Sequence, residues 1–284
     1  MTAPHRAAVS LVTVSYYSGD YLPGFFASVT GASAAPVASV LVNNAGDDPA
    51  LPAIAATLPG VTVVDPGDNL GYGKAMNLGV TRTADSEWLL LSNPDLTLSP
   101  GAIDELVRVG GSDPRIGAVG PLIHTPSGEV YPSARRLPSL RHGIGHAIFG
   151  QVWKSNPWTR SYLADRENPP RERDAGWLSG ACLLVRREAF EQVGGFDDKF
   201  FMYFEDVDLC ARIGRAGWRI VYAPSAELMH VGGHSTDRVN RAMIRVHHES
   251  AYKYLAARYT GWYLGPLRLA LRVGLRLRAS ITRR

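Results

Sequence analysis

Strand-like and helix-like segments alternate through residues 1–120, and this alternation limits the possible folds more than any other feature of the chain. Apolar runs predict strands at 9–15, 37–42, 61–64, 88–91 and 116–119. Helix-like segments lie at 21–29, 73–83 and 101–109. Because strand and helix in turn indicate a mostly parallel sheet covered by helices, we predict an α/β fold.

The later part of the chain is expected to begin irregularly and to end in helices. Residues 126–128 predict the turn of a small hairpin, and 132–175, rich in Pro, Trp, Arg and His, predict a long loop or an active-site flap. Further elements are expected as a strand at 181–185, helices from near 186 and 205, strands near 218–222 and ending at 229, and a long helix at 237–259.

The net charge of +4 is divided unevenly along the chain. Residues 264–284 contain six arginines and no acid, which leaves 24 basic and 26 acidic residues before them. A nucleic-acid-binding domain would carry basic charge over its folded surface, so the sequence argues against nucleic acid as a partner. Hydrophobic residues make up 45% of the chain, which allows a sizeable core and excludes general disorder.

The two cysteines, Cys182 and Cys210, lie in apolar stretches without metal-ligand spacing. We therefore predict buried free thiols and a reducing compartment. The amino-terminal residues do not resemble a signal peptide, and the longest uncharged run, 21–46, contains two prolines and many small polar residues. No transmembrane helix is predicted.

Polar residues follow the predicted strands. Ser15 and Tyr16 follow the first strand, Asn43 and Asn44 the second, and residues 92–95 the fourth. Ligands of open α/β sheets bind beyond the carboxyl ends of the strands. The polar residues therefore cluster where a nucleotide would bind.

Asp95 ends the segment Asn93-Pro94-Asp95. A carboxylate beside an amide can hold a hard divalent cation that bridges two phosphates. The alternative is that Asp95 caps a turn after Pro94.

Three acids occupy the start of the helix near residue 205. Helical geometry places Asp206 on the face of Cys210 and Ile213, whereas Asp208 lies near Arg212 and Arg215. Glu205 is close to that arginine side, so Glu205 and Asp208 are interpreted as a solvated, ion-paired face. Asp206 either complements the helix dipole or acts as a general base toward a hydroxyl group, and we favour the base.

Two further segments carry candidate ligands. His230 and His234 lie beside glycines and suggest a metal or phosphate site, for which His230 would need Asp95 nearby. Residues 69–74 form a possible anion-binding turn that contains two glycines and a lysine. The chain lacks both the P-loop spacing and a GxGxxG motif after the first strand, which disfavours phosphotransfer and dinucleotide binding.

Together these motifs resemble the family 2 glycosyltransferases with the GT-A fold. Segments 43–46 and 69–77 correspond to the family's donor motifs, 93–95 to its metal-binding Asp-x-Asp, and 180–181 and 205–206 to its acceptor-side motifs. The resemblance implies a Rossmann-like, nucleotide-sugar-binding mixed sheet flanked by helices. It also implies donor contacts from Ser15, Tyr16, Asn43, Asn44, Asn69, Gly71, Lys74 and Asn93.

The same resemblance assigns chemical roles. It implies that Asp206 is the catalytic base, that Asp95 binds Mg²⁺ or Mn²⁺, and that His230 is an additional ligand of this ion. It implies acceptor contacts from Gly180, Ala181, Glu205 and Trp177, and Trp153 and Trp158 are weaker candidates for the same groove. Arg135 and Arg136 either pair with an acceptor diphosphate or are surface arginines.

Two positions depart from the family pattern. Asn43 replaces an aspartate that many members use to bind the nucleotide base, and an amide can both donate and accept a hydrogen bond. Asn93 replaces the first acid of Asp-x-Asp. Metal binding is therefore expected to depend on Asp95, and the preferred base is left open.

Segments 131–136, 176–180, 201–203 and the tail from residue 250 are similar to actinobacterial rhamnosyltransferases that act on polyprenyl-diphospho-N-acetylglucosamine. This similarity implies inverting transfer from dTDP-β-L-rhamnose to the 3-hydroxyl of the lipid-linked GlcNAc, which makes the arabinogalactan linker of the cell wall. It implies a peripheral enzyme on the cytoplasmic face of the plasma membrane. We expect a catalytic domain at 1–236, with a nucleotide-sugar half at 1–120 and an acceptor half at 121–236, and a helical extension at 237–284.

The tail is predicted to be a basic amphipathic helix that lies on an anionic membrane, because Arg268, Arg272 and Arg276 recur every four residues among leucines. The alternatives are a helix packed on the catalytic domain with its arginines in water, or a disordered end. Galactofuranosyl or another family 2 transfer is the nearest functional alternative, and a non-catalytic sugar-nucleotide-binding module is the third. The sequence leaves homo-oligomer formation open.

Overall fold

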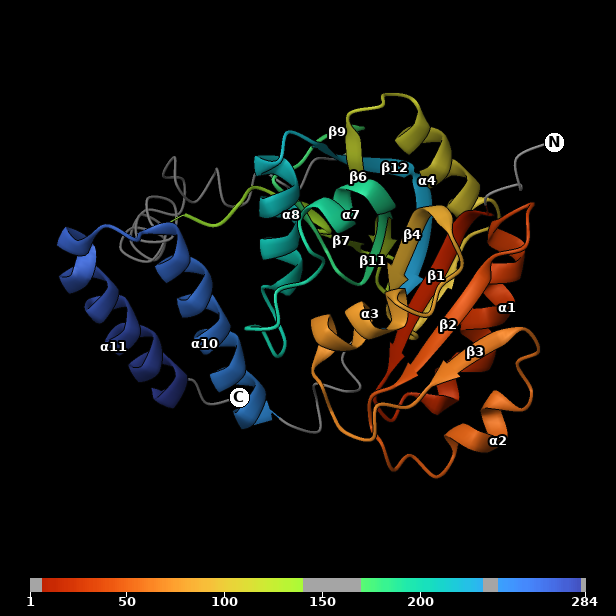
Figure 1. The fold of residues 1–284 in the computed structure, drawn as a ribbon, viewed down its shortest axis with the longest axis horizontal. Helices are drawn as coiled ribbons and strands as arrows, with labels where there is room; N and C mark the ends of the chain where they lie inside the picture. Colours follow the sequence, from red (N-terminus) through yellow and green to blue (C-terminus); the bar gives the residue numbers. More distant parts are fainter. Residues whose placement is uncertain (1–6, 140–169, 232–239, 282–284) are drawn as a thin grey trace.

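The computed structural model describes residues 7–139, 170–231 and 240–281. The first four main strands lie in the order β3-β2-β1-β4 and are all parallel (Figure 1). Their bounds are β1 Ala7–Ser15, β2 Ala38–Asn43, β3 Val61–Val64 and β4 Ser86–Ser92. The predicted alternation of strand and helix is confirmed over this part of the chain.

Beyond β4 the sheet becomes mixed. Strand β11 (Cys182–Arg186) is antiparallel to both β4 and β6 (Ile116–His124), and β12 (Arg219–His230) then pairs in parallel with β6. The short β5 (Leu96–Leu98) forms the edge beside β12. The mixed sheet that the family resemblance implied is thus present. Strands β6 and β12 run in the same direction as β1 to β4, so the mostly parallel sheet inferred from alternation is also confirmed, with β11 and the short β5 as the antiparallel strands of this order. A strand buried on both faces is an apolar run in either direction, so its composition does not reveal its direction.

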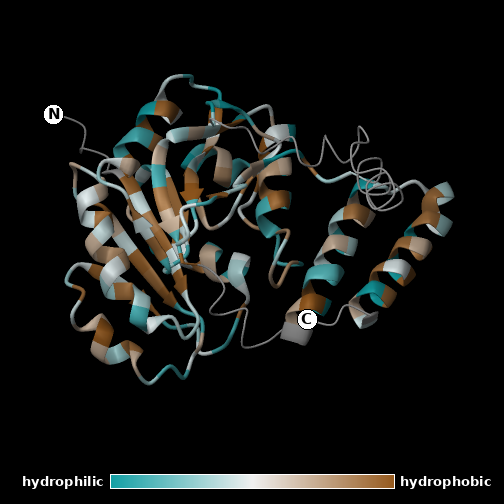
Figure 2. Ribbon diagram, turned by 180° about the vertical axis from the view of Figure 1, so that it is seen from behind, coloured by the Kyte–Doolittle hydropathy of each residue, from teal (hydrophilic) through white to brown (hydrophobic). Residues whose placement is uncertain are grey.

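Helices cover both faces of the sheet. Helices α1 (Leu22–Ala32), α2 (Leu51–Ala55) and α4 (Ala102–Gly111) contribute to the core on one face. Helices α3 (Tyr72–Val80), α7 (Arg187–Gln192) and α8 (Glu205–Arg215) contribute to the core on the other. Strand side chains alternate between the two faces, and Figure 2 shows the strands as a largely hydrophobic layer between the helices.

Smaller elements complete the sheet edges. The hairpin predicted at 126–128 joins β6 to β7 (Val130–Tyr131), and Gly128 has a φ of 81° in its turn. Strands β8 (Ala134–Arg135) and β10 (Trp177–Leu178) form a separate pair, and β9 (Arg173–Asp174) joins β12. The two strands expected near 218–222 and 229 are one strand, β12, with an irregularity between Ala223 and Glu227. The sequence patterns missed η1 (Gly19–Tyr21), α2 and β5.

Both cysteines are buried and free, as predicted, and burial raises the pKa of each thiol to about 12. The division expected at residue 120 falls inside β6, so both halves contribute strands to one continuous sheet. The boundary expected at 236 and 237 lies outside the described residues. None of the helices in the described ranges has the length and apolarity needed to cross a bilayer.

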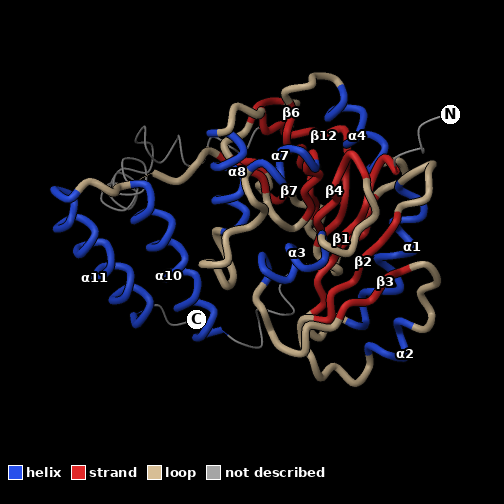
Figure 3. The backbone as a smooth tube through the Cα atoms, viewed as in Figure 1, coloured by secondary structure: helices blue, strands red, loops and turns tan. Residues whose placement is uncertain are grey.

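The chain ends in two long helices that stand beside the α/β body (Figure 3). Helix α10 (Asn240–Arg258) packs on the body through Tyr254, which contacts a small apolar cluster with Phe200 and Val207, and the Ser250 hydroxyl donates to the Met202 carbonyl at 2.9 Å. After η2 (Trp262–Leu264), α11 (Gly265–Ile281) lies against α10. The tail is therefore helical as predicted, and the alternative of a disordered end is wrong for these residues.

Candidate active site

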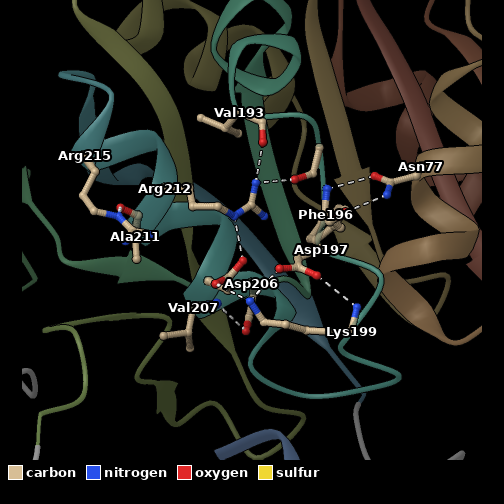
Figure 4. Close-up of polar contacts among 12 residues, drawn as sticks. Asn77, Val193, Phe196, Asp197, Lys199, Asp206, Val207, Ala211, Arg212 and Arg215 are labelled. Carbon is tan, nitrogen blue, oxygen red and sulfur yellow. Dashed lines mark hydrogen bonds and ion pairs between the residues drawn. The ribbon is translucent and has the colours of Figure 1, made fainter. Parts of the chain in front are cut away.

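Asp206 lies in the first turn of α8, and backbone donors hold its carboxylate. The Gly180 N–H donates to Oδ2 at 2.9 Å. The Val207 N–H donates to Oδ1 at 2.8 Å (Figure 4). The side chain retains partial solvent exposure. Burial of the carboxylate raises the pKa of Asp206, and the two N–H donors and the charge of Arg135 only partly oppose this shift. The result is an oriented carboxylate with increased basicity that solvent can still reach.

The approach to α8 is conformationally unusual. Tyr203 and Phe204 have φ angles of 66° and 67°, in the left-handed region that bulky residues rarely occupy. Two consecutive residues of this kind turn the chain sharply into the helix that carries Asp206. Strained backbone of this type concentrates at functional sites, and no pattern in the sequence reveals it.

Gly180 and Ala181 connect Asp206 to the strand-end residues. A Cβ atom at Gly180 would lie 3.2 Å from the Asp206 Cβ, so glycine permits the close approach. The Gly180 carbonyl accepts the Tyr72 hydroxyl at 2.6 Å, and the Ala181 carbonyl accepts the Asn93 N–H at 2.8 Å. This segment therefore joins α8, α3 and the loop after β4 into one structural unit.

Asp95 and His230, which are 135 residues apart in sequence, are in contact. His230 Nε2 lies 3.1 Å from Asp95 Oδ1, and the side chains are 18% and 15% exposed. Antiparallel pairing of His230 with Leu96 brings the end of β12 to this loop, and the Val231 N–H donates to the Asp95 carbonyl at 3.1 Å. The proposal that His230 is a metal ligand depended on Asp95 lying nearby, and the structure meets this condition. His234 lies outside the described residues.

The chemistry of this pair fits a divalent cation. A carboxylate oxygen and an imidazole nitrogen are both ligands for Mn²⁺-type ions, and two protein ligands leave positions for diphosphate oxygens. Within the described residues, no group of three or more His, Cys, Asp or Glu side chains could hold a metal by itself.

Some of the predicted donor residues form hydrogen bonds that hold the turn at 69–71, and others have a buried polar atom without a hydrogen bond. Asn44 Oδ1 accepts the Leu70 N–H at 2.9 Å, and Asn44 Nδ2 donates to Asn69 Oδ1 at 3.0 Å. Asn43 Nδ2 donates to Asp65 Oδ2 at 3.1 Å, an acidic partner that the sequence reasoning missed. Asn43 Oδ1 and the Ser15 hydroxyl are buried without a hydrogen-bond partner among the described residues. Asn44 and Asn69 thus shape the turn, while Asn43 has a buried oxygen without a hydrogen bond.

The other donor candidates occupy the same edge of the sheet. Tyr16 follows β1 and contacts the Tyr17 ring edge-to-face, Asn93 follows β4, and Lys74 is exposed on α3. Gly71 has a φ of 79°, and a Cβ atom there would lie 2.3 Å from the Phe201 carbonyl, so only glycine fits. The Phe201 carbonyl also accepts the Tyr72 N–H at 2.9 Å. The donor motif therefore touches the loop that leads to Asp206.

The interpretation of Glu205 and Asp208 as a solvated face is wrong, and the expected ion pairing is confirmed for Asp208 but not for Glu205. Both are buried, at 7% and 5% exposure: Glu205 lies against Gly73 of α3, and Asp208 contacts Lys199 in the segment before α8. Asp208 does pair with Arg212 at 2.7 Å, and Arg212 also donates to the carbonyls of Val193 and Gly195 (Figure 4). Arg215 instead donates to the Ala211 carbonyl.

Glu205 has no arginine partner among the described residues, and its Oε2 atom is buried without a hydrogen bond. Burial and the neighbouring Asp206 raise the pKa of Glu205 to about 8. At neutral pH this side chain is therefore mostly protonated. Helical periodicity located the acids on the helix but could not reveal what covers each face.

The predicted acceptor residues lie beside Asp206 on the β8–β10 pair. Arg135 stacks over the Trp177 ring at 5.6 Å from its centroid, and Trp177 Nε1 donates to the Arg136 carbonyl at 3.1 Å. Arg135 is close enough to oppose the rise in the Asp206 pKa. The structure thus brings Trp177, Arg135 and Gly180 to one side of the carboxylate. Trp153 and Trp158 lie outside the described residues.

Solved structures with the same fold are sugar transferases. A mannosyltransferase from Pyrobaculum calidifontis, solved with GDP-Man and Mn²⁺, matches with a TM-score of 0.59 and 16% identity over 99% of this chain and 77% of that chain. GalNAc-T7, solved with UDP, GalNAc and Mn²⁺, matches with a TM-score of 0.58 and 15% identity over 96% of this chain and 55% of that chain. The protein therefore has the GT-A fold.

The sequence family is equally clear. The family described as "Glycosyltransferase like family 2" matches residues 6–249, and the chain belongs to this family of glycosyltransferases. The N-acetylglucosaminyl-diphospho-decaprenol L-rhamnosyltransferase of Mycobacterium tuberculosis strain H37Rv is 45% identical over 281 residues, 95% of this chain and 91% of that protein. The rhamnosyltransferase WbbL of Escherichia coli K12 is 28% identical over 66% of this chain and 70% of that protein.

Proposed function

We propose that this glycosyltransferase moves L-rhamnose from dTDP-β-L-rhamnose to the 3-hydroxyl of GlcNAc in a polyprenyl-diphospho-GlcNAc. The identity of 45% over 95% of the chain with a rhamnosyltransferase of that acceptor class supports the substrates. The observation that carries the chemistry is the Asp206 carboxylate, oriented by two backbone N–H groups and linked through Gly180 and Ala181 to the strand-end loop with Asp95. In this proposal residues 1–236 act as the catalytic domain.

The proposed reaction is a single displacement with inversion. Asp206 accepts the proton of the acceptor hydroxyl while that oxygen forms a bond to the anomeric carbon. The bond between this carbon and the donor diphosphate oxygen breaks on the opposite side, so a β-linked donor gives an α-linked product. Raised basicity from burial makes Asp206 a better proton acceptor than an exposed aspartate.

Asp95 and His230 are the residues that would hold Mg²⁺ or Mn²⁺. Such a cation, when bound, supplies stabilisation of the negative charge on the leaving diphosphate. On the donor side we propose contacts from Ser15, Tyr16, Asn43, Lys74 and Asn93, with Asn44, Asn69 and Gly71 shaping the turn. The unsatisfied Asn43 oxygen supports a contact with the nucleotide base.

On the acceptor side we propose contacts from Trp177, Arg135, Arg136, Gly180 and Ala181. The position of Trp177 and Arg135 beside Asp206 supports this assignment. Glu205, which carries its carboxyl next to Asp206, acts in this proposal by supporting the base rather than by touching the acceptor.

The chain would work as a peripheral protein at the cytoplasmic face of the plasma membrane, in assembly of a cell-wall linker. Its arginine-rich helix α11 supports attachment to an anionic surface. Removing residues 264–284 should lower sedimentation with membranes more than it lowers turnover of a short-chain acceptor. Unchanged sedimentation would exclude this role of the tail.

The direct test is incubation with radiolabelled dTDP-rhamnose and polyprenyl-diphospho-GlcNAc, with Mg²⁺, with Mn²⁺ and with chelator. We expect a rhamnosylated lipid to form when Mg²⁺ or Mn²⁺ is present and not when the chelator is present. Transfer from UDP-galactofuranose but not from dTDP-rhamnose would replace the donor assignment. Binding of nucleotide sugar without turnover on any lipid acceptor would refute the enzymatic proposal.

A further inference from the structure

Helix α11 presents apolar and basic residues on different sides. Trp262, Leu269, Val273 and Leu277, in η2 and α11, are 49–89% exposed and follow a near-helical repeat. We call these residues the exposed apolar row. The basic side chains Arg272 and Arg276 instead line a groove against α10.

This interhelix groove has a volume of about 540 Å³ and is lined by residues of α10 and α11. Basic side chains reach it from both helices: Arg245 and Lys253 from α10, Arg272 and Arg276 from α11. The volume falls within the range of sites for small molecules and headgroups, roughly 300–1,000 Å³.

Positive charge in the groove is largely uncompensated. Its one acidic residue, Glu249, pairs with Lys253 at 3.2 Å, and Lys253 also donates to the Lys199 carbonyl. Arg245 and Arg276 have no carboxylate partner within residues 7–139, 170–231 and 240–281. Arg272 stacks on the Tyr252 ring, with 5.7 Å between its guanidinium carbon and the ring centroid. These three arginines of one groove form no ion pair with a carboxylate of the described residues, which favours an anionic ligand.

Phosphate is the anion that best fits these side chains. A guanidinium donates two parallel hydrogen bonds to phosphate oxygens, and arginines on two facing helices can hold one group from both sides. Val273 follows Arg272 and Leu277 follows Arg276, so the exposed apolar row adjoins the arginines that line the groove. A ligand that joins a phosphate to hydrocarbon chains would contact both surfaces.

We propose that the interhelix groove binds the phosphate headgroup of an anionic phospholipid, while the exposed apolar row contacts the acyl chains of the same bilayer. This inference extends the proposed function, since it rests on the acceptor being a membrane lipid. It also orients the enzyme, because α10 packs on the residues that lead into α8: the Ser250 hydroxyl bonds to Met202, and the His247 ring lies 5.3 Å from the Tyr203 ring. A lipid held between α10 and α11 would therefore attach the membrane to the helix that packs on the segment leading to Asp206.

The test compares arginines of the same helix in the full-length chain. Arg276→Gln removes a groove residue, and Arg278→Gln makes the same charge change two residues later, outside the groove lining. Binding is measured by sedimentation with phosphatidylcholine vesicles that contain or lack phosphatidylglycerol. Loss of one charge near an anionic surface weakens binding about fivefold at any position. Loss of a charge-assisted hydrogen bond in the groove should weaken it by more than about tenfold, and Arg272→Gln with Arg276→Gln further still.

If Arg276→Gln and Arg278→Gln weaken vesicle binding equally, the groove is not a specific site, and binding depends only on the general positive charge of the helix. Glycerol 3-phosphate should compete with the part of the vesicle binding that depends on Arg276. If the protein binds this soluble compound tightly but shows no preference for vesicles that contain phosphatidylglycerol, the groove does not bind a lipid headgroup. Leu269→Ser with Val273→Ser should reduce vesicle binding. If these substitutions instead abolish self-association in analytical ultracentrifugation and leave vesicle binding unchanged, the row belongs to a second copy of the chain.

Thermal unfolding confirms that each variant is folded. The vesicle-binding experiment contains no donor or acceptor sugar. A negative result would therefore exclude the lipid-binding groove without affecting the proposed rhamnosyl transfer, which the transfer assay tests independently.

Discussion

The loop after β4 and the first turn of α8 both present a carboxylate at one end of the sheet, but they hold it in different ways. Asp206 accepts hydrogen bonds from the backbone of Gly180 and Val207, and no cationic side chain among the described residues is bonded to it. Asp95 lies 3.1 Å from the imidazole of His230, and both of these side chains remain partly exposed. Backbone donors orient a carboxylate without neutralising it, whereas an imidazole beside a carboxylate forms a pair of metal ligands. The contrast supports a proton acceptor at Asp206 and a cation site at Asp95.

The largest expected effect on transfer comes from Asp206→Asn. The amide keeps an oxygen for the Gly180 N–H but cannot accept the acceptor proton, so kcat should fall by about 10²–10⁴. Nucleotide binding, measured by calorimetry, should stay close to that of the wild type. Transfer at a near wild-type rate would exclude Asp206 as the base.

Asp95→Asn should produce the next largest effect. Losing the charged ligand should raise the Mn²⁺ concentration needed for half-maximal transfer by about tenfold or more. Glu129→Gln, which changes an exposed carboxylate in the hairpin turn, is the matched control and should leave the metal dependence unchanged. The same metal dependence in Asp95→Asn and in the control would place the cation elsewhere.

Arg212→Met tests how α8 is anchored. Arg212 joins Asp208 to the carbonyls of Val193 and Gly195, and the Asp208 side chain is only 7% exposed. Without Arg212 the buried Asp208 carboxylate keeps only its longer contact with Lys199 Nζ at 3.6 Å among the described residues, so the free energy of unfolding should fall by about 3 kcal/mol and the rate of transfer should fall severalfold. Arg215→Met, on the exposed side of the same helix, should change stability by less than about 0.5 kcal/mol in the same denaturant titration. Equal destabilisation by both variants would contradict the anchoring role.

Glu205→Gln should have the smallest effect on transfer at neutral pH, because the wild-type carboxyl is already mostly protonated. The folded protein binds this proton up to a pKa of about 8, whereas the unfolded chain releases it near 4.5. Stability therefore falls as pH rises through this window, on the order of a few kcal/mol. The glutamine variant should lack this part of the decline in unfolding titrations across the window. A wild-type pH dependence of stability in the variant would show that Glu205 ionises normally.

Local patterns predicted the elements that form the first half of the sheet and the acids that open α8. Strand and helix periodicity need only neighbouring residues, and β1 to β4 with α1, α3 and α4 are close to their predicted positions. The direction of β11 could not be predicted, since its apolar run is buried whichever way it pairs. Periodicity also misjudged Glu205 and Asp208, because the covering segments are distant in sequence.

The tail shows the same limit. The repeat of Arg268, Arg272 and Arg276 predicted a basic amphipathic helix, and α11 is helical. Helix α11 does not stand free: it lies against α10, which belongs to the helical extension expected at 237–284 and not to the catalytic domain expected at 1–236. A helical repeat says which residues share a side, but it does not say which side faces another helix. Only packing against α10 placed Arg272 and Arg276 in a groove and left Leu269, Val273 and Leu277 exposed.

The sequence by itself determined the alternation that builds the sheet, the polar residues at the strand ends and the separation of charge between body and tail. These properties depend on composition and on residues that are close together in the sequence, so they can be predicted from the sequence alone. Tertiary structure alone decided that His230 meets Asp95 across 135 residues, that Gly180 bonds to Asp206, and that the Glu205 Oε2 atom is buried without a hydrogen bond from any described residue. Contacts and dielectric surroundings of this kind arise from segments far apart in the chain, and they exist only after the sheet and helices have packed together.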